Sequence, residues 1–441
     1  MPGDDAVTVR RGAGRMATTT AAPAAAVAAG GGGVVPRAAT GAGGLRVLWP
    51  LLCLEAGGGL VWCGLAAEGA ARWALTGLAA APAALLLLAV AAWRHGEPLS
   101  SWLGAVLALR RRRREAVGAP PGSDPLFALA AECRPGLRSY AYAGPGGGEM
   151  GMAAHGGGLT AVLRVEARRA PLQPGHAERP LPLALLYQAL ETDGIRLESV
   201  QSVQHTQPAP APILPERSVA GASYSLLQPR GEGGTPALRL TWVALRLDPE
   251  LCPAAVAERG GGLLGAQRAL ARAAGQLASR LAGAGFAARV LTEAELLSAV
   301  AACASSNPLA TTLIGQGDGS RPRRTREEAR VWRCDDRWHT TYRVARWPGL
   351  GSGATPLPAL VALLTSLPAF ATTFSLTLSG RGRGTVALSA HVRVTGRGQE
   401  ELRAAGRRLL RAARAARVVL ARMDRRQLPG LQATLPLGGE G

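Results

Sequence analysis

Two long apolar stretches lie close together near the start of the chain, over residues 47–67 and 73–93. The first contains one charged residue, Glu55, and the second contains none. A bilayer core about 30 Å thick is crossed by roughly 20 helical residues, and both stretches have that length. We therefore predict a transmembrane helix hairpin over residues 45–95, preceded by a disordered segment over residues 1–44. The alternative is a buried helical hairpin of a soluble protein.

Arginine is distributed unevenly around this hairpin. It is frequent on both flanks, whereas the turn between the two apolar stretches contains only Arg72. Basic residues close to membrane spans favour the cytoplasmic side. We therefore predict a multi-pass protein of the cell membrane whose N- and C-termini both lie in the cytoplasm. The flanking arginines are Arg10, Arg11, Arg15, Arg37 and Arg46 before the hairpin, and Arg94 and Arg110–Arg114 after it.

A pattern of helical period follows within residues 96–125, which we interpret as an amphipathic basic helix and a linker. Apolar residues share one face of this helix, and a run of arginines follows them. Such a helix is typical of the membrane interface, where its basic end suits anionic lipid headgroups. A plain basic flank without a specific lipid partner is the alternative. The apolar face comprises Leu99, Trp102, Leu103, Val106 and Leu107, and the candidate lipid contacts are Arg110, Arg111, Arg112, Arg113 and Arg114.

Beyond a Pro/Gly-rich segment, short apolar runs alternate with helical stripes. Residues 238–247 begin with Leu238, Leu240 and Trp242 on one face, which is the alternation of a β-strand. Residues 263–284 instead repeat apolar residues at helical spacing. In this first series we predict strands over 159–166, 195–204, 238–247 and 286–292, and helices over 182–192 and 263–284.

A second series of elements repeats the order β-α-β-β-α-β. The repeat predicts an α/β (α+β) region made of two tandem ferredoxin-like units. The first cytoplasmic unit would span residues 126–314 and the second residues 331–441, joined by a linker at 315–330. One mixed α/β domain is the alternative. In the second series we predict strands near 338–347, 372–379, 385–394 and 417–423, and helices over 357–369 and 399–415.

Composition excludes several classes of function. The formal net charge is +20, and every basic residue is arginine because the chain contains no lysine. A P-loop ATPase needs a lysine at the phosphates, so that class is excluded. The six cysteines are scattered without a C-x-x-C pair, which argues against a disulfide framework and suits a reducing compartment. Aromatic residues do not accompany the basic run, so we expect no nucleic-acid partner.

The densest group of reactive side chain types is Cys334, Asp335, Asp336 and His339. In a strand, Cys334 and Asp336 would share a face while His339 pointed to the other, which is poor geometry for a metal ion. We therefore favour a turn that leads into a strand. No catalytic motif of known spacing is present, so we expect no catalytic residues, no cofactor, no metal and no small-molecule substrate. A membrane-anchored hydrolase that uses Asp335, Asp336 and His339 is the enzymatic alternative.

Three long segments carry a family resemblance, together with the basic-flanked hairpin. They are LALLYQALETDGIRLESVQSVQHTQPAPAP at 183–212, LRLTWVALRLDPELCPAAVAERGGGLLGAQRALARAA at 238–274 and WRCDDRWHTTYRVARWP at 332–348. From about Leu45 onward the chain resembles EccE, a membrane component of the actinobacterial type VII (ESX) secretion system. The first 44 residues carry no resemblance.

This resemblance implies a non-enzymatic scaffold subunit of the inner-membrane core complex. Its partners would be membrane subunits of the EccB, EccC and EccD type, and the complex would export small WXG100-type proteins. The family offers no catalytic residue to carry over to this sequence. It also implies a cytosolic domain, in agreement with the arginine distribution. An anionic-lipid-binding module built on Arg110–Arg114 is a further alternative.

Overall fold

The computed structural model describes most of the chain after residue 98, in the ranges 99–116, 123–144, 148–168, 180–208, 237–315, 323–348, 356–380 and 386–439, together with isolated positions elsewhere. The predicted hairpin at 45–95 and the predicted disordered segment at 1–44 lie outside these ranges. Within them, no helix is both long and apolar enough to cross a bilayer. The helix predicted around the arginine run is present as α3 (Leu99–Arg114).

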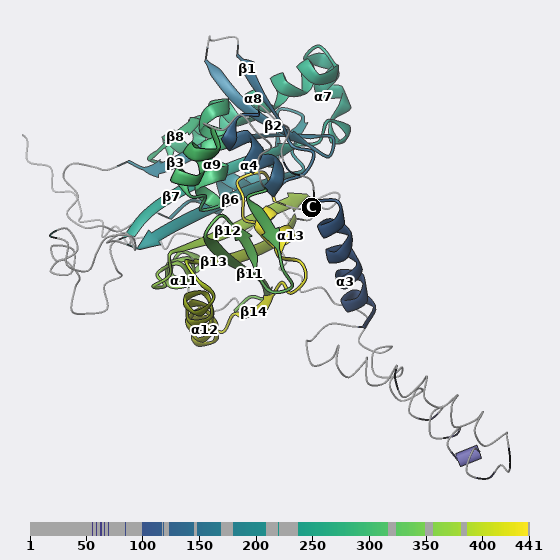
Figure 1. The fold of residues 1–441 in the computed structure, drawn as a ribbon. Coiled ribbons are helices and arrows are strands. Elements are labelled where there is room, and N and C mark those ends of the chain that lie inside the picture. The colour runs from purple at the N-terminus through teal and green to yellow at the C-terminus, as the bar shows by residue number, and fades with distance from the viewer. Residues whose placement is uncertain are drawn as a thin grey trace, which may run out of the picture.

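A 12-stranded antiparallel sheet organises this part of the chain (Figure 1). Its order is β1-β2-β3-β7-β6-β12-β13-β11-β10-β9, while β8 pairs with β3 and β14 pairs with β11. The short strands β4 (Glu191–Thr192) and β5 (Ile195–Arg196) form a separate ladder. The strands of the large sheet are β1 (Arg138–Ala143), β2 (Glu149–His155), β3 (Gly158–Ala167), β6 (Ser199–Pro208), β7 (Ala237–Leu247), β8 (Phe286–Val290), β9 (Thr325–Glu327), β10 (Trp332–Cys334), β11 (Arg337–Arg346), β12 (Ala371–Gly380), β13 (Val386–Gly396) and β14 (Val419–Arg422).

Helices cover both faces of this sheet, and the α+β class with a large antiparallel sheet is thereby confirmed. Besides α3, they are α4 (Pro125–Cys133), α5 (Leu183–Ala189), the 3₁₀ turn η1 (Pro249–Leu251), α7 (Pro253–Glu258), α8 (Gly262–Gly283), α9 (Glu293–Cys303), α10 (Pro308–Gly315), α11 (Leu357–Thr365), α12 (Gln399–Ala415) and α13 (Gln427–Gln432).

The two predicted series have the same pairing of strands. In the first, which runs β3-α5-β6-β7-α8-β8 along the chain, the strands lie side by side in the order β8-β3-β7-β6. In the second, which runs β11-α11-β12-β13-α12-β14, the order is β14-β11-β13-β12. Numbered along the chain, both orders read 4-1-3-2, with every pair antiparallel. This is the strand order of a split β-α-β unit.

A seam of two long strands joins the series into one sheet. Strand β6 pairs antiparallel with β12, from Ser199 opposite Ser379 to Thr206 opposite Thr372. Both strands are the second of their series, so equivalent edges meet each other. The backbone hydrogen-bonding groups of β6 and β12 are therefore used inside the sheet rather than left open at two edges.

The four helices of the two series lie on one face of the sheet. Leu163 and Leu245 point to this face and pack with Leu277 of α8. Directly opposed residues of antiparallel strands share a face. At the seam, Val200 of β6 opposes Leu378 of β12, and both belong to the same buried cluster. Helices α11 and α12 continue this layer over β12 and β13.

The opposite face is covered by α4, α9 and α13. Trp242 of β7 and Val203 of β6 point to this side, where they belong to one buried cluster with Leu129, Val300 and Leu431 of the three helices. Successive residues of a strand point to opposite faces. The near-continuous burial of β3 and β7 therefore follows from cover on both sides of the sheet.

The segment after α13 crosses this second face from the second series to the first. The backbone N–H of Gly438 donates to Gln201 Oε1 at 2.9 Å, and Gln201 Nε2 donates to the carbonyl oxygen of Ala433 at 2.9 Å. The Ser199 hydroxyl donates to the carbonyl oxygen of Gly438 at 2.6 Å. Gln201 is fully buried, so these bonds satisfy a side chain that would otherwise be costly to bury.

Replacement of glycine by alanine is expected to change stability in opposite directions at two positions of α8. A Cβ at Gly265 would clash with the carbonyl oxygen of Val256 in α7, whereas a Cβ at Gly275 would meet nothing within 4 Å. We expect Gly265→Ala to lower the free energy of unfolding by about 1–3 kcal/mol through overpacking. Gly275→Ala should raise it by about 0.5–1 kcal/mol through helix propensity. Urea unfolding measures both, and effects of the same sign would contradict the close packing of α7 on α8.

Candidate functional site

The five candidate lipid-contact arginines lie in the C-terminal turns of α3. One face of this helix rests on the body of the protein through residues at helical spacing. Ala105 and Leu109 are buried there, and Arg112 follows one turn later on the same face. Helical residues three and four apart share a face. The exposed Leu103 and Leu107 have the same spacing as Ala105 and Leu109, so the sequence of α3 alone does not select the docked side.

An ion pair anchors the C-terminal half of α3. Arg112 donates from Nε and Nη2 to the two carboxylate oxygens of Glu327 in β9, at 2.8 and 3.0 Å. Arg113 Nε donates to the carbonyl oxygen of Glu327 at 2.9 Å, and Glu327 Oε1 also accepts from the backbone N–H of Leu428 at 2.9 Å. The Glu327 side chain is 4% exposed. A bidentate pair of this kind fixes orientation as well as charge, so Arg112 holds α3 to the body.

The N-terminal half of α3 is held by two arginines that follow β14. The Arg425 guanidinium lies over the Trp102 ring, 4.9 Å from its centroid. Arg426 Nη2 donates to the carbonyl oxygen of Ser101 at 3.3 Å. Trp102 therefore faces the body, whereas the sequence pattern placed it on one apolar face with Leu103 and Leu107. The reason is the cation–π partner, which a helical pattern alone does not contain.

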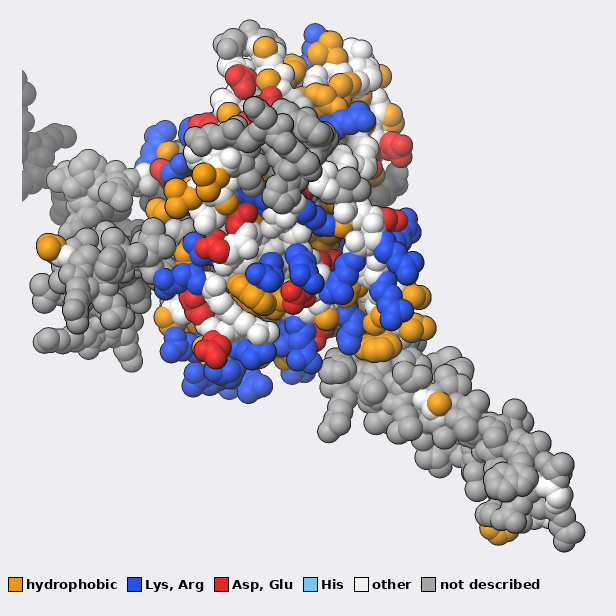
Figure 2. Space-filling view, in the orientation of Figure 1, with side chains coloured by type: hydrophobic (Ala, Val, Ile, Leu, Met, Phe, Trp, Pro, Cys, Tyr) orange, Lys and Arg blue, Asp and Glu red, His pale blue; other side chains and the backbone are white. Residues whose placement is uncertain are grey.

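The outward side of α3 combines leucine with arginine. Leu103 and Leu107 are 50% and 56% exposed, and Arg110 and Arg114 continue the same stripe at helical spacing and are exposed too. Arg111 is also exposed and pairs with Glu115 at 2.7 Å. Figure 2 shows basic side chains along the side of the molecule where α3 lies. Of the five arginines, Arg110, Arg111 and Arg114 are thus the ones that face away from the body.

The Cys334–His339 group forms a hairpin turn, as the sequence favoured. Cys334 opposes Arg337 in the ladder of β10 and β11, and Asp335 and Asp336 make the connection. Asp335 has a φ of +51°, a conformation that Asp tolerates better than most residues. The hairpin therefore accounts for the two adjacent aspartates in structural terms.

Two members of this group are bound in separate structural interactions. Asp335 accepts from Arg324 Nε at 2.9 Å and Nη2 at 2.7 Å, and from the backbone N–H of Asn307 at 2.9 Å. His339 is buried, hydrogen-bonds through Nδ1 to Thr395 Oγ1 at 3.0 Å and lies with its ring 5.0 Å from that of Trp332. Burial holds the pKa of His339 well below its ordinary value, so this side chain is neutral. Neither residue is presented to a substrate.

The remaining members of the group are Cys334, which is buried, and Asp336, which is exposed. Burial raises the pKa of the Cys334 thiol, and the thiol is inert in that state. Asp336 pairs with Arg337 at 2.6 Å at the surface. Among the residues with described positions, no three His, Cys, Asp or Glu side chains are arranged to hold a metal ion.

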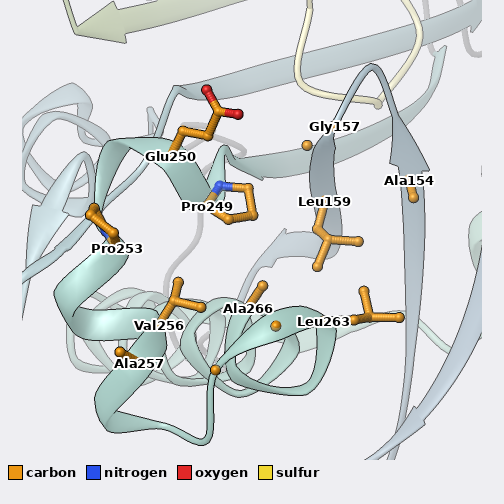
Figure 3. Close-up of a pocket in the computed structure, with 13 residues that line it drawn as sticks. Ala154, Gly157, Leu159, Pro249, Glu250, Pro253, Val256, Ala257, Leu263 and Ala266 are labelled. Atoms are coloured by element: carbon orange, nitrogen blue, oxygen red, sulfur yellow. The ribbon is translucent and has the colours of Figure 1, made fainter.

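An open apolar groove of about 530 Å³ lies beside β2 and β3, at the end of the sheet opposite to β9 and β10. It is bounded by the β2–β3 turn, the η1–α7 connection and the start of α8 (Figure 3). Leu159, Val256 and Leu263 supply apolar surface, and Glu250 is the single charged residue in its lining. Such a lining suits an apolar side chain or ligand better than a charged substrate. No sequence pattern predicted this groove, although the Gly260–Gly262 run at its rim marks a backbone turn.

Comparison with known proteins identifies one region of the chain. Residues 235–344 match a family model described as "Putative type VII ESX secretion system translocon, EccE". This region is EccE-like. The resemblance stated from the sequence is thereby confirmed over residues 235–344, and with it the relation to a type VII secretion component rather than to a known family of enzymes. No curated protein matches the chain.

The EccE match covers the middle of the fold. It begins just before β7, contains α7, α8, α9 and α10, and ends within β11. The Cys334–His339 hairpin and most of the groove lining lie inside it, whereas α3 and α12 lie outside. The description of EccE as a translocon component implies association with a membrane.

Proposed function

We propose that this protein is a non-enzymatic structural subunit of the type VII secretion core complex in the inner membrane. It would act with EccB-, EccC- and EccD-type subunits and support the export of WXG100-type proteins. The observation that carries the proposal is the EccE match over residues 235–344. The use of Asp335 and His339 in structural contacts agrees with a scaffold role.

The anchor in this proposal is the transmembrane hairpin at 45–95, with both termini in the cytoplasm. The apolar sequence of that segment and its arginine flanks support it. The docking of α3 adds a mechanical element, since α3 follows the hairpin directly in the chain. Bound through Arg112, Glu327 and Trp102, it would connect the anchor rigidly to the large sheet.

The body of the subunit consists, in our proposal, of two tandem ferredoxin-like units. The identical 4-1-3-2 strand order of the two series supports it. Each unit by itself would expose a long second strand, and the antiparallel seam between β6 and β12 removes both edges. We propose the boundaries 126–314 and 331–441 for these units. Within the predicted linker at 315–330, Thr325–Glu327 form β9, which pairs with β10 of the second unit.

The complex is tested by deleting the gene and restoring it with an affinity-tagged copy. We expect the tagged protein to co-purify from detergent with the secretion ATPase subunit of the EccC type. Export of WXG100-type proteins should fall in the deletion strain and recover with the tagged copy. Normal export in the deletion strain, together with a tagged protein that purifies alone, would contradict the proposal.

Anionic lipid is the proposed contact of the outward arginines of α3. Flotation of residues 96–441, which lack the hairpin, with phosphatidylglycerol vesicles should weaken when Arg110, Arg111 and Arg114 are all changed to glutamate. Each basic residue near an anionic surface contributes about 1 kcal/mol, so the effect should diminish with added salt. The control variant makes the same change in net charge at exposed positions away from α3, with glutamate in place of Arg138, Arg280 and Arg403. It should leave flotation unchanged. Equal weakening by both sets would refute a specific contact.

A further inference from the structure

Helix α12 presents a rigid row of arginines to solvent. Its inner side is fixed to the sheet by Leu402, Ala405 and Leu409, which are buried. Its outer side carries exposed arginines along the whole length of the helix. They are Arg403, Arg407, Arg408, Arg411 and Arg414. Figure 2 shows this concentration of basic side chains along the lower edge of the body, where Figure 1 places α12.

Apart from Glu400, three positions before Arg403, α12 offers these arginines no acidic neighbour that is not already paired. Ion pairs occur before and after the row, between Arg397 and Glu401 at 3.7 Å and between Arg422 and Asp424 at 2.6 Å. Between them, none of the five arginines forms an ion pair with a residue whose position is described. Like charges at i and i+4, as at 403, 407 and 411, destabilise a helix. The row therefore costs stability, and folding of this helix does not require it.

The neighbouring helix α11 has the opposite character. It packs beside α12 on the same face of the sheet and contains no charged residue. Pro358, Ala359 and Leu363 lie on its exposed side, with Leu363 39% exposed. An apolar strip and a cationic strip therefore run next to each other, and we call the two together the α11–α12 face.

We propose that the α11–α12 face binds an acidic, amphipathic segment of a protein partner. Carboxylates of the segment would pair with the α12 arginines, whose guanidinium groups suit bidentate carboxylate contacts. Its apolar side chains would pack on α11. The inference rests on the proposed function in one respect, since a secretion complex supplies protein neighbours for such a face.

Two other occupants fit the observations less well. A nucleic acid would use the arginines, but no Trp, Tyr or Phe lies on the exposed side of α11 or α12 for stacking. A membrane that covered the outward stripe of α3 would lie elsewhere, because α3 and α12 are on different sides of the body, with β11, β14 and α13 between them in Figure 1. An acidic protein segment uses both strips of the face.

The test uses the full chain, purified in detergent, and a fluorescent amphipathic peptide with glutamate on one helical face and leucine on the other. We expect saturable binding measured by fluorescence anisotropy.

Arg407→Glu with Arg411→Glu should raise the Kd about tenfold, because two exposed ion pairs are replaced by repulsion. Arg407→Lys with Arg411→Lys should change the Kd less than about threefold, since the charge remains. Leu363→Asp should weaken binding through the apolar strip.

Matched controls separate this face from general attraction to a basic protein. Arg138→Glu with Arg280→Glu makes the same change in net charge at exposed positions of β1 and α8, and should leave the Kd unchanged. Equal weakening by the control pair, or no weakening by the α12 pair, would overturn the proposal. So would α12-dependent binding of phosphatidylglycerol vesicles or of a single-stranded oligonucleotide without binding of the peptide. If the protein binds the peptide but does not co-purify with the secretion ATPase subunit, only the proposed function is contradicted.

Discussion

Changing Asp335 to asparagine is expected to lower the free energy of unfolding by about 3–5 kcal/mol, which is typical when one partner of a buried ion pair is removed. Arg324 and Asp335 have side chains 4% and 7% exposed and meet through two hydrogen bonds. Without the carboxylate, the Arg324 charge stays buried with its strongest partner gone. Asparagine keeps the size of the side chain and tolerates the positive φ, so the loss reports the charge. Urea unfolding of the full chain, followed by tryptophan fluorescence, measures it.

Asp336 supplies the control for this substitution. It is the next residue of the same turn, but its side chain is 50% exposed in its pair with Arg337. Arg337 is 11% exposed, but the Asp336 carboxylate is half in water, so Asp336→Asn should lower stability much less than Asp335→Asn. Equal effects of the two substitutions would show that the Arg324–Asp335 pair is not buried as described. A loss of export with Asp336→Asn at normal stability would favour the hydrolase alternative.

Mild acid is expected to destabilise the protein through histidines with lowered pKa values, of which His205 and His339 are the most deeply buried. His205 and His339 are both about 1% exposed on the second face of the sheet. Burial, with the nearby Arg393 charge, lowers the pKa of His205 to about 3 and that of His339 well below its ordinary value. In the unfolded chain both titrate near 6.5. The unfolded state therefore takes up protons that the folded state does not.

The sign and the pH window follow from these shifts. Stability from the two neutral histidines is fully present above pH 6.5 and is lost as the pH falls below that value. Each histidine contributes a slope of about 1.4 kcal/mol per pH unit. The carboxyl groups with lowered pKa values, Asp193 and Glu295, add their own loss only at lower pH. Unfolding measured between pH 7 and 5, in steps, isolates the histidines.

A double variant tests the assignment of this slope. His205→Gln with His339→Gln replaces both rings with amides that do not titrate, so the slope of stability against pH should fall by about half. The remaining slope comes from His155 and His391, whose pKa values burial lowers to about 4. Its stability at pH 7 is expected to be lower, because His205 and His339 hydrogen-bond to Thr373 and Thr395. A variant that keeps the slope of the original protein would show that other groups cause the acid sensitivity.

The elements of the two series could be predicted from sequence because their patterns were strong. The alternation at 238–247 and the apolar stripe at 263–284 correspond to β7 and α8, and all the other predicted strands and helices overlap observed ones. The least accurate prediction was the strand at 195–204, where the chain first forms β5 and then β6. A bend at Leu197–Glu198 separates the two, and neither residue is a typical chain breaker.

Several elements of the second face escaped prediction. Helix α9 has an N-terminal capping box of Thr292 and Glu295, a start signal that the sequence contained and that could have identified it. Helices α4 and α13 are short, and strands β9 and β10 have only three residues each. Such segments are shorter than the windows of roughly 11–18 residues for a helix and 4–8 for a strand over which a pattern is recognised.

The candidate site was predicted in part. The basic end of α3 was found, but its division into outward arginines and the docked Arg112 depends on Glu327, which is 215 positions away. No pattern local to α3 contains that information. The arginine row of α12 was visible in the sequence at helical spacing, yet its significance depends on the uncharged helix beside it.

The seam between β6 and β12 also bears on the origin of the chain. Two identical subunits that paired through their second strands about a two-fold axis would build the same sheet. The polypeptide is thus arranged as a fused homodimer. Fusion into one chain fixes the stoichiometry of the two halves at one to one. It also allows the sequence of each half to change independently of the other. One half accordingly carries the apolar groove and the other the arginine row, a specialisation that identical subunits cannot acquire.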